Sequence, residues 1–307
     1  MKKNKGEVIK PFLDFSFKYL FATEESKPNL IGFLNLVLMP QSPIVDLEYM
    51  NSESIPVSKE YKGCIFDIIC KNKEGERFLI EMQNQQVVNV KERIIYYTCR
   101  MIDRMGFKGR EWDYLNIKKA YAICLMNFTY ESDPILRRDI QLYDVNEGKI
   151  FSDKLNIILL QLPCLNATNI NECGVYYEYL LYLLREMHET MKTVDQLKQE
   201  VANTKLPQEM KELFYKVLDT ADYASLPEKD QLRYESDLKN YMDTMSCIKF
   251  AENKGKSEGR AEGIAKGRAE GIAEGILTVA KNLKAQNIPL QTIMESTGLT
   301  KEQIDSL

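Results

Sequence analysis

The stretch that most constrains this chain runs from Lys62 to Gln83 and reads as two strands folded back on each other. The strands cover Cys64–Cys70 and Phe78–Gln83, and both are rich in β-branched and other apolar residues. Gly75 between them suits the left-handed position of a three-residue hairpin loop, Lys73–Gly75. A β-hairpin of known register is therefore the first structural prediction.

The loop length decides which side chains face each other. If Asn72 pairs with Glu76, counting back along both strands places Asp67 opposite Glu81. Directly opposed residues hold their Cβ atoms about 4.5–5.5 Å apart on one face of the sheet. Gln83 shares that face, because side chains alternate along a strand. The strands are otherwise apolar on both faces, and such strands are covered on both faces.

Two carboxylates on a covered face need an explanation. They are either solvated acids at an exposed end of the sheet, or the ligands of a cation. Burying an unpaired charge is strongly unfavourable, and a second like charge nearby makes it worse. Magnesium is typically held by one or two carboxylates, waters and the phosphate oxygens of a substrate. The pair Asp67 and Glu81 therefore makes metal-dependent nuclease chemistry the leading hypothesis.

The composition excludes several other chemistries. The chain has 307 residues, a net charge of −4 and one histidine, His188, which lies among charged residues and is predicted to be solvated. Catalysis of the Ser-His-Asp or Cys-His type needs a histidine beside its nucleophile. The seven cysteines form no CxxC pair, and no signal peptide or long apolar run is visible. These features predict a cytoplasmic protein with no membrane segment, in which any DNA site is a local patch.

Asp67 followed by Glu81-Met82-Gln83 resembles the metal motif of the PD-(D/E)XK nuclease superfamily. More narrowly, it resembles the Rpn family of recombination-promoting nucleases and transposases. The superfamily usually has a lysine two residues after the acid, where this chain has Gln83. The resemblance implies an α/β fold with a restriction-endonuclease-like αβββαβ core. It also implies a DNA endonuclease dependent on Mg²⁺ or Mn²⁺, with a link to DNA recombination or transposition.

A second part of the resemblance lies near the N-terminus, in the segment DFSFKYLF from Asp14 to Phe21. In that family an acidic residue on the first helix lies near the metal site, which makes Asp14 a candidate third carboxylate. The alternative is that Asp14 caps the helix, since its side chain can accept from a backbone amide. If Asp14 is the third carboxylate, Lys18, one turn later, would touch phosphate or pair with Asp14.

The segment from 89 to 105 carries apolar residues spaced three or four apart, which predicts a helix with one core-facing stripe. Part of it, RIIYYTCRM, resembles the family's second core helix, which implies that Arg93 and Tyr97 lie near the metal site. Its basic residues are predicted to hold the DNA backbone, although such a run is also typical of a solvated face. With the basic residue of the first helix, the predicted DNA contacts are Lys18, Lys91, Arg93, Arg100 and Arg104.

The rest of the core is predicted from apolar runs and turn residues. Four further strands are expected, at Ile44–Asn51, Lys119–Met126, Ile140–Val145 and Leu155–Leu162. From Gly174 onward the pattern becomes helical. The predicted divisions are a nuclease-like core at 1–165, a helical extension at 166–250, a glycine-rich helical stalk at 251–284 and a helix-turn-helix-like tail at 285–307.

The stalk has a glycine at every fourth position from Gly255 to Gly275. Each glycine in a helix costs roughly 1 kcal/mol relative to alanine, so something should compensate. Rows of small residues permit close helix approach, and a four-residue row drifts in the right-handed sense. A right-handed helix pair in a homodimer is expected from the 255–276 repeat, with a flexible, partly helical linker as the alternative. In the tail, Gly298 and a Thr300–Gln303 capping box predict two short helices.

Together these observations predict an enzyme. Asp67 and Glu81, helped by Asp14, would bind the cation, and Gln83 would position the attacking water. The alternative is a catalytically weak or inactive protein of the same fold that binds DNA or serves assembly. The glutamine at 83 is the feature that keeps this alternative open.

Overall fold

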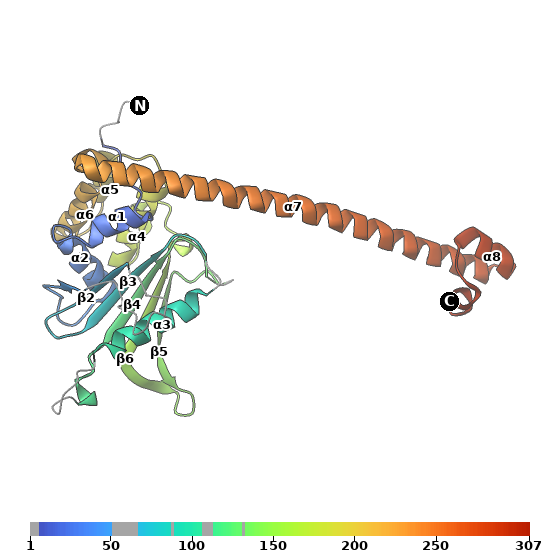
Figure 1. Ribbon diagram of the computed structural model, residues 1–307, viewed down its shortest axis with the longest axis horizontal. Helices are drawn as coiled ribbons and strands as arrows, with labels where there is room; N and C mark the ends of the chain where they lie inside the picture. The colour runs from blue at the N-terminus through green and yellow to red at the C-terminus, as the bar shows by residue number, and fades with distance from the viewer. Residues whose placement is uncertain (1–5, 51–66, 87–88, 106–112, 131–132) are drawn as a thin grey trace, which may run out of the picture. The chain divides into compact units, whose positions relative to one another are not determined.

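The computed structural model describes residues 6–50, 67–86, 89–105, 113–130 and 133–307 (Figure 1). Its chain separates into two compact units, Met1–Lys239 and Asn240–Leu307. Helix α7, Glu228–Ala285, belongs to both units and also contains the predicted division at 250. The four-part division of the sequence therefore stays a prediction.

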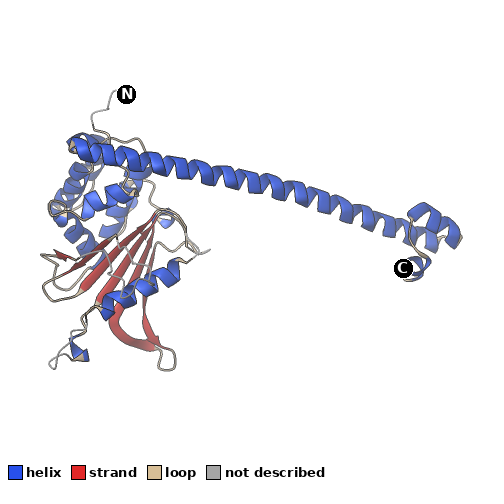
Figure 2. Cartoon of the chain, viewed as in Figure 1, coloured by secondary structure: helices blue, strands red, loops and turns tan. Residues whose placement is uncertain are grey.

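Within the described residues of the first unit, six strands form one mixed sheet (Figure 2). Strand β1 pairs antiparallel with β2, and β2 pairs antiparallel with β3. Strands β3, β4 and β6 are parallel, and β5 returns antiparallel beside β6. In sheet order the strands are β1 Glu48–Tyr49, β2 Ile68–Lys71, β3 Arg77–Gln83, β4 Ala120–Met126, β6 Lys149–Gln161 and β5 Arg137–Asp144.

The predicted hairpin is present between β2 and β3. The amide of Asn72 donates to the Glu76 carbonyl at 3.1 Å, and Ile68 pairs with Ile80. Gly75 has a φ of 81°, which is the left-handed conformation expected of it. The predicted loop and register are therefore confirmed, while residues 64–66 of the first predicted strand lie outside the described residues.

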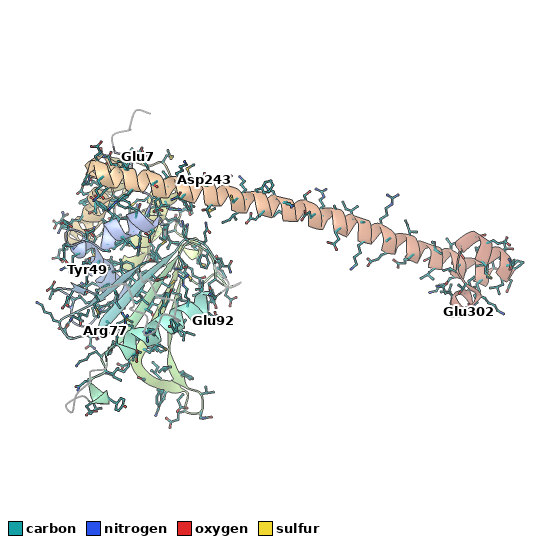
Figure 3. The ribbon with its side chains drawn as sticks, viewed as in Figure 1. Glu7, Tyr49, Arg77, Glu92, Asp243 and Glu302 are labelled. Carbon is teal, nitrogen blue, oxygen red and sulfur yellow. The ribbon has the colours of Figure 1, made fainter. Side chains whose placement is uncertain are left out.

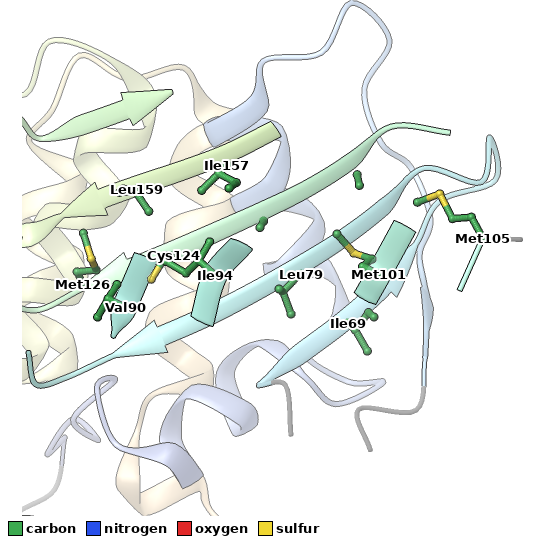
Figure 4. Packing of buried hydrophobic residues seen from close by; sticks show 12 residues of the cluster. Ile69, Leu79, Val90, Ile94, Met101, Met105, Cys124, Met126, Ile157 and Leu159 are labelled. Carbon is green, nitrogen blue, oxygen red and sulfur yellow. The ribbon is translucent and has the colours of Figure 1, made fainter. Parts of the chain in front are cut away.

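Helix α3, Val90–Asp103, covers one face of this sheet, as its apolar stripe predicts. Arg77 of β3 holds its C-terminal end by donating to the carbonyls of Met101 at 3.0 Å and Arg104 at 2.9 Å. Figure 3 labels Arg77 near this end and Glu92 in the first turn at the other end. Figure 4 shows α3 in front of the strands. A cluster of buried residues lies between the helix and the sheet, and it consists of Ile69, Leu79, Val90, Ile94, Met101, Met105, Ala120, Ala122, Cys124, Met126, Ile157 and Leu159.

Helices of the first unit supply the rest of its core. They are α1 Asp14–Phe21, α2 Lys27–Leu38, α4 Tyr176–Glu189, α5 Val194–Ala202 and α6 Gln208–Thr220. Short 3-10 turns occupy Tyr114–Asn116, Leu162–Cys164, Ile170–Glu172 and Tyr223–Ser225. In Figure 4 the blue N-terminal helices lie behind the strands, on the side opposite α3. Both faces of the sheet are thus covered, as the apolar strands predict.

His188 corrects one expectation from the sequence. The side chain is buried rather than solvated, because α4 packs its last turn against the N-terminal segment. The Phe12 ring meets the imidazole edge-on with 5.2 Å between ring centroids. Burial lowers the pKa of His188 to about 4, so a neutral imidazole fills this position at neutral pH.

Three predicted strands differ in length from the observed ones. The strand expected at Ile44–Asn51 is reduced to Glu48–Tyr49 over residues 44–50, while Asn51 lies outside the described residues; the Asn35 side chain of α2 binds both backbone groups of Ile44 at 2.8 Å. Those backbone groups are thereby satisfied without a strand partner. Strand β5 begins three residues earlier than predicted, and β6 begins six residues earlier, because the two continue as a long antiparallel ribbon.

In the second unit, α7 carries all six glycines of the stalk as a helix. A Cβ atom built on any of them would meet nothing within 4 Å. Two short helices follow, α8 Leu290–Thr297 and α9 Lys301–Asp305, which pack Ile293 and Ile304 on Ala280 of α7. Gly298 in the left-handed conformation and the Thr300–Gln303 capping box confirm the two short helices predicted at these positions. Among the described helices, none combines the length and apolarity needed to cross a membrane.

Candidate active site

Asp67 and Glu81 lie opposite each other at the end of the β2–β3 hairpin. The pairing of Ile68 with Ile80 continues by one residue to this pair. The Asp67 carboxylate accepts a hydrogen bond of 2.6 Å from the Met82 amide, which ties it to β3. Both side chains are on the α3 side of the sheet, as Ile69 and Leu79 are. The sequence count therefore predicts the juxtaposition correctly.

Glu81 is 5% exposed and its two carboxylate oxygens have different surroundings. Oε1 accepts from Arg93 Nη2 at 2.5 Å and from Gln83 Nε2 at 2.9 Å. Oε2 is buried and has no hydrogen-bond partner among the described residues. An unpartnered carboxylate oxygen in the protein interior is costly, and it marks a place where a ligand can be accepted.

The electrostatics of the pair also favour a cation. Burial, reinforced by the charge of Asp67, raises the pKa of Glu81 to about 7, although Arg93 opposes the shift. Burial also raises the pKa of Asp67, and the Met82 amide works against that rise. The protein thus leaves a buried carboxylate, Glu81, and a half-buried one, Asp67, incompletely neutralised. A hard divalent cation with oxygen ligands fits this donor set.

Asp14 is the first residue of α1, and Leu13 occupies the N-cap position. The predicted capping role is therefore wrong. The physical reason is Asp237 of α7, whose carboxylate accepts a hydrogen bond of 3.0 Å from the Phe15 amide. This carboxylate thereby satisfies a backbone amide in the first turn of α1. Asp14 instead pairs with Lys18 at 2.7 Å, which is one of the two contacts predicted for that lysine.

The charges of Asp14 and Lys18 both act on Asp67, with opposite effects on its pKa. Among the described residues, however, no three His, Cys, Asp or Glu side chains form a group able to hold a metal ion. A direct ligand role for Asp14 accordingly stays a prediction.

The basic residues of α3 have distinct surroundings. Arg93 contacts Glu81 directly, and its guanidinium also lies 5.7 Å from the centroid of the Tyr97 ring. Arg100 pairs with Asp103 at 3.2 Å, while the ammonium of Lys91 lies 5.1 Å from the Tyr130 ring centroid. Residues 93, 100 and 104 recur on one side of a helix with 3.6 residues per turn. Arg93, Arg100 and Arg104 are half-buried along this side.

Cys124 is a site neighbour that sequence reasoning missed. It is the register partner of Glu81 on the parallel strand β4 and is buried. Burial raises the pKa of its thiol, and the Glu81 charge raises it further, so it forms an uncharged side of the site. Nothing in an apolar run such as Ala120–Met126 distinguishes this cysteine from its neighbours, because the contact depends on pairing between distant strands.

A comparison with protein-family models assigns residues 11–251 to the PD-(D/E)XK nuclease family transposases. The match covers most of the chain. This protein belongs to that family. The assignment of Asp67 and Glu81 to the family's acidic positions, and of Gln83 to the position of the usual lysine, stays a prediction. The family match begins just before α1 and ends before the first glycine of the repeat.

Searches among curated proteins and among solved structures gave no match. The family match by itself supports a nuclease or transposase-like function. The particular chemistry has to be argued from the site itself.

Proposed function

We propose that this PD-(D/E)XK protein is a metal-dependent DNA endonuclease that hydrolyses phosphodiester bonds, with a role in recombination or transposition. The observation that carries the proposal is that half-buried Asp67 lies opposite buried Glu81, one oxygen of which has no partner among the described residues. Two carboxylates that face each other away from bulk water destabilise the fold, because each raises the free-energy cost of ionising the other. They are suited to holding a divalent cation.

In this proposal each side chain of the site has a defined chemical role. Asp67 and Glu81 would hold Mg²⁺ or Mn²⁺, with Asp14 nearby as the predicted third acid. Such a cation lowers the pKa of a bound water and stabilises the charge that develops at phosphorus. The Gln83 amide donates to Glu81 Oε1, which fixes that carboxylate and leaves the amide oxygen to orient the attacking water. Arg93 stands where it can meet a phosphate oxygen as well as Glu81.

The direct test is cleavage of supercoiled DNA with Mg²⁺ or Mn²⁺, compared with the same reaction in EDTA. We expect cleavage with either metal and none in EDTA. Asp67→Asn should lower the rate by about a thousandfold, which corresponds to about 4 kcal/mol. Asp139→Asn is the matched control, because Asp139 is exposed and pairs with Arg137 on β5. Full activity in the Asp67 variant would contradict the assignment.

Binding of DNA by α3 can be measured separately from cleavage. The double variant Arg100→Ala and Arg104→Ala should bind duplex DNA more weakly, without a change in sequence preference. The slope of log affinity against log salt should fall by about 2, because each phosphate contact contributes about 0.9. Lys198→Ala is the control, since Lys198 pairs with Asp219 away from α3. An unchanged slope in the double variant would remove these arginines from the interface.

A second candidate is a weak or inactive member of the family that keeps the fold and serves as a DNA-binding or assembly protein. The observation that favours it is Gln83, because neutral glutamine offsets no charge beside two carboxylates. DNA binding without cleavage in every divalent metal tested would support this candidate over the endonuclease. A cytoplasmic location is expected for both.

We further infer that the glycine repeat of α7 brings two copies of the chain together. Its glycines carry an energetic cost in a helix, and in the described residues nothing packs against them. Sedimentation of a chain ending at Phe250 tests the inference. The truncated chain should be a monomer at concentrations at which the full chain is a dimer, and equal association of the two chains would exclude the repeat as the contact.

A further inference from the structure

The repeat in α7 is symmetric about Ala265. Reading outward from this residue, every glycine meets a glycine at the same distance on the other side. The alanines 261 and 269 match in the same way, and Ser257 matches Ala273. The matched glycine pairs are 263 with 267, 259 with 271, and 255 with 275. A helix with this pattern presents the same small-residue profile in both directions along its axis.

The charged residues follow the same symmetry with their signs reversed. Between positions 254 and 276 no matched pair joins two like charges. Three pairs join opposite charges, and the remaining charged residues match isoleucines, against which long charged side chains can lay their apolar stems. The oppositely charged pairs are Lys256 with Glu274, Arg260 with Glu270, and Glu262 with Arg268.

Helix geometry places Lys256 and Glu274, the oppositely charged pair farthest from Ala265, on the side of α7 that carries Gly263 and Gly267. Lys256 and Glu274 are eighteen residues apart, which is five full turns, so both project from one side of α7. Gly263 and Gly267 lie within about 20° of that same direction. The side of α7 that carries these glycines, and so lacks large side chains at its centre, therefore has a positive charge at one end and a negative charge at the other.

This side of α7 has no intramolecular use within the described residues. Added Cβ atoms on the six glycines would meet nothing within 4 Å, and Lys256 and Glu274 are exposed. The ion pairs along this part of the helix are long, at 3.8 Å for Lys254–Glu258 and 3.9 Å for Lys266–Glu270. Exposed pairs of this kind contribute little to stability. The charges therefore remain available to a partner.

Alternative alignments of two such helices are worse. Parallel helices in register would oppose every charge to its own copy. Antiparallel helices shifted by one glycine step in either direction would oppose Arg260 to Lys266, or Lys266 to Arg268. Like charges in juxtaposition are unfavourable, so the alignment centred on Ala265 is favoured over its neighbours.

We propose that α7 pairs with α7 of a second copy of this chain in antiparallel orientation, about a twofold axis level with Ala265. The proposal rests on the inferred homodimer and adds its direction and register. Close approach of the glycine sides compensates the helix for its glycines, and charge complementarity selects the register. At each end of the paired segment, Lys256 of one copy lies level with Glu274 of the other copy. The nuclease assignment is independent of this arrangement.

The direction can be measured with spin labels on Cys247, which is exposed on α7. In a full-length variant whose other cysteines are replaced by alanine, circular dichroism and thermal unfolding would verify the fold. The antiparallel register places the two labels about 54 Å apart along the axis, whereas parallel helices would place them within about 20 Å. A short distance would overturn the proposal while leaving a homodimer. A monomer in sedimentation would overturn both.

Charge reversal tests the register. Lys256→Glu alone and Glu274→Lys alone should each weaken dimerisation at least about tenfold at low salt, because each places like charges together at both ends of the pair. The double variant Lys256→Glu with Glu274→Lys should restore the original dissociation constant. Parallel pairing predicts no loss in the single variants, since like charges would already face each other. Unchanged single variants, or a double variant weaker than both, would overturn the proposed register.

Discussion

Glu81→Gln is expected to slow Mg²⁺-dependent cleavage strongly and, at the same time, to stabilise the metal-free protein at alkaline pH. Loss of one of two cation ligands should lower the cleavage rate by about a thousandfold. The stabilising effect follows from the pKa of Glu81, which burial raises from 4.5 to about 7. A carboxyl whose pKa is raised on folding contributes its full stability below the unfolded value. That contribution is lost as the pH rises through the folded value.

The glutamine variant has no carboxyl at this position, so it does not lose stability as the pH rises. At pH 8 its free energy of unfolding should exceed that of the parent by about 2–3 kcal/mol, and its melting temperature by about 5 °C. At pH 5 the two proteins should differ little. Thermal unfolding in EDTA at both pH values measures this. Glu92→Gln is the matched control, because Glu92 is exposed on α3 and should leave cleavage and stability unchanged. A glutamine variant less stable than the parent at pH 8 would refute the electrostatic account of the site.

Gln83→Lys is expected to raise the cleavage rate by about tenfold or more. The glutamine amide already donates to Glu81 Oε1 at 2.9 Å, so a longer ammonium can reach the same oxygen. A positive charge there would lower the pKa of both carboxyls and keep them ionised for the cation. A lysine can also orient or deprotonate the attacking water, an effect typically worth 10²–10⁴-fold in general base catalysis.

The measurement is the initial rate of plasmid nicking at saturating Mg²⁺, with Gln83→Leu as the companion variant of similar size. The leucine variant should lose activity, because it can neither donate to Glu81 nor position water. If lysine and leucine both leave the rate at the parent value, residue 83 does not act in the reaction. The inactive alternative for this protein would gain support if none of the three proteins cleaves DNA in any divalent metal.

The parts of the site that sequence predicts are those determined by local geometry. Gly75 and a three-residue loop define the hairpin, and the two-residue alternation of strands then brings Asp67 to Glu81. The capping box at Thr300 is local in the same sense. In each case the contacting residues are separated by a countable stretch of regular structure, so the period of that structure is sufficient for the prediction.

The parts that sequence does not predict depend on how distant elements pack. Arg93 reaches Glu81 only because α3 crosses the sheet at one particular angle and position. Cys124 lies beside Glu81 because of the parallel pairing of β3 with β4. His188 has charged neighbours in sequence, yet its own side of α4 is covered by Phe12. Helical periodicity describes which residues share a side, but not which partner will cover that side.

The hairpin loop has a consequence for how this gene can vary. Lys73 and Glu74 are exposed, so their identities are free to drift. The number of residues in the loop is not free, because each residue added or removed shifts one strand against the other. A one-residue shift turns Asp67 to the opposite face from Glu81 while both strands keep their apolar character. Tolerance to substitution and intolerance to single-codon insertion or deletion should therefore coincide in this loop, and family members that keep the site should share its length more faithfully than its sequence.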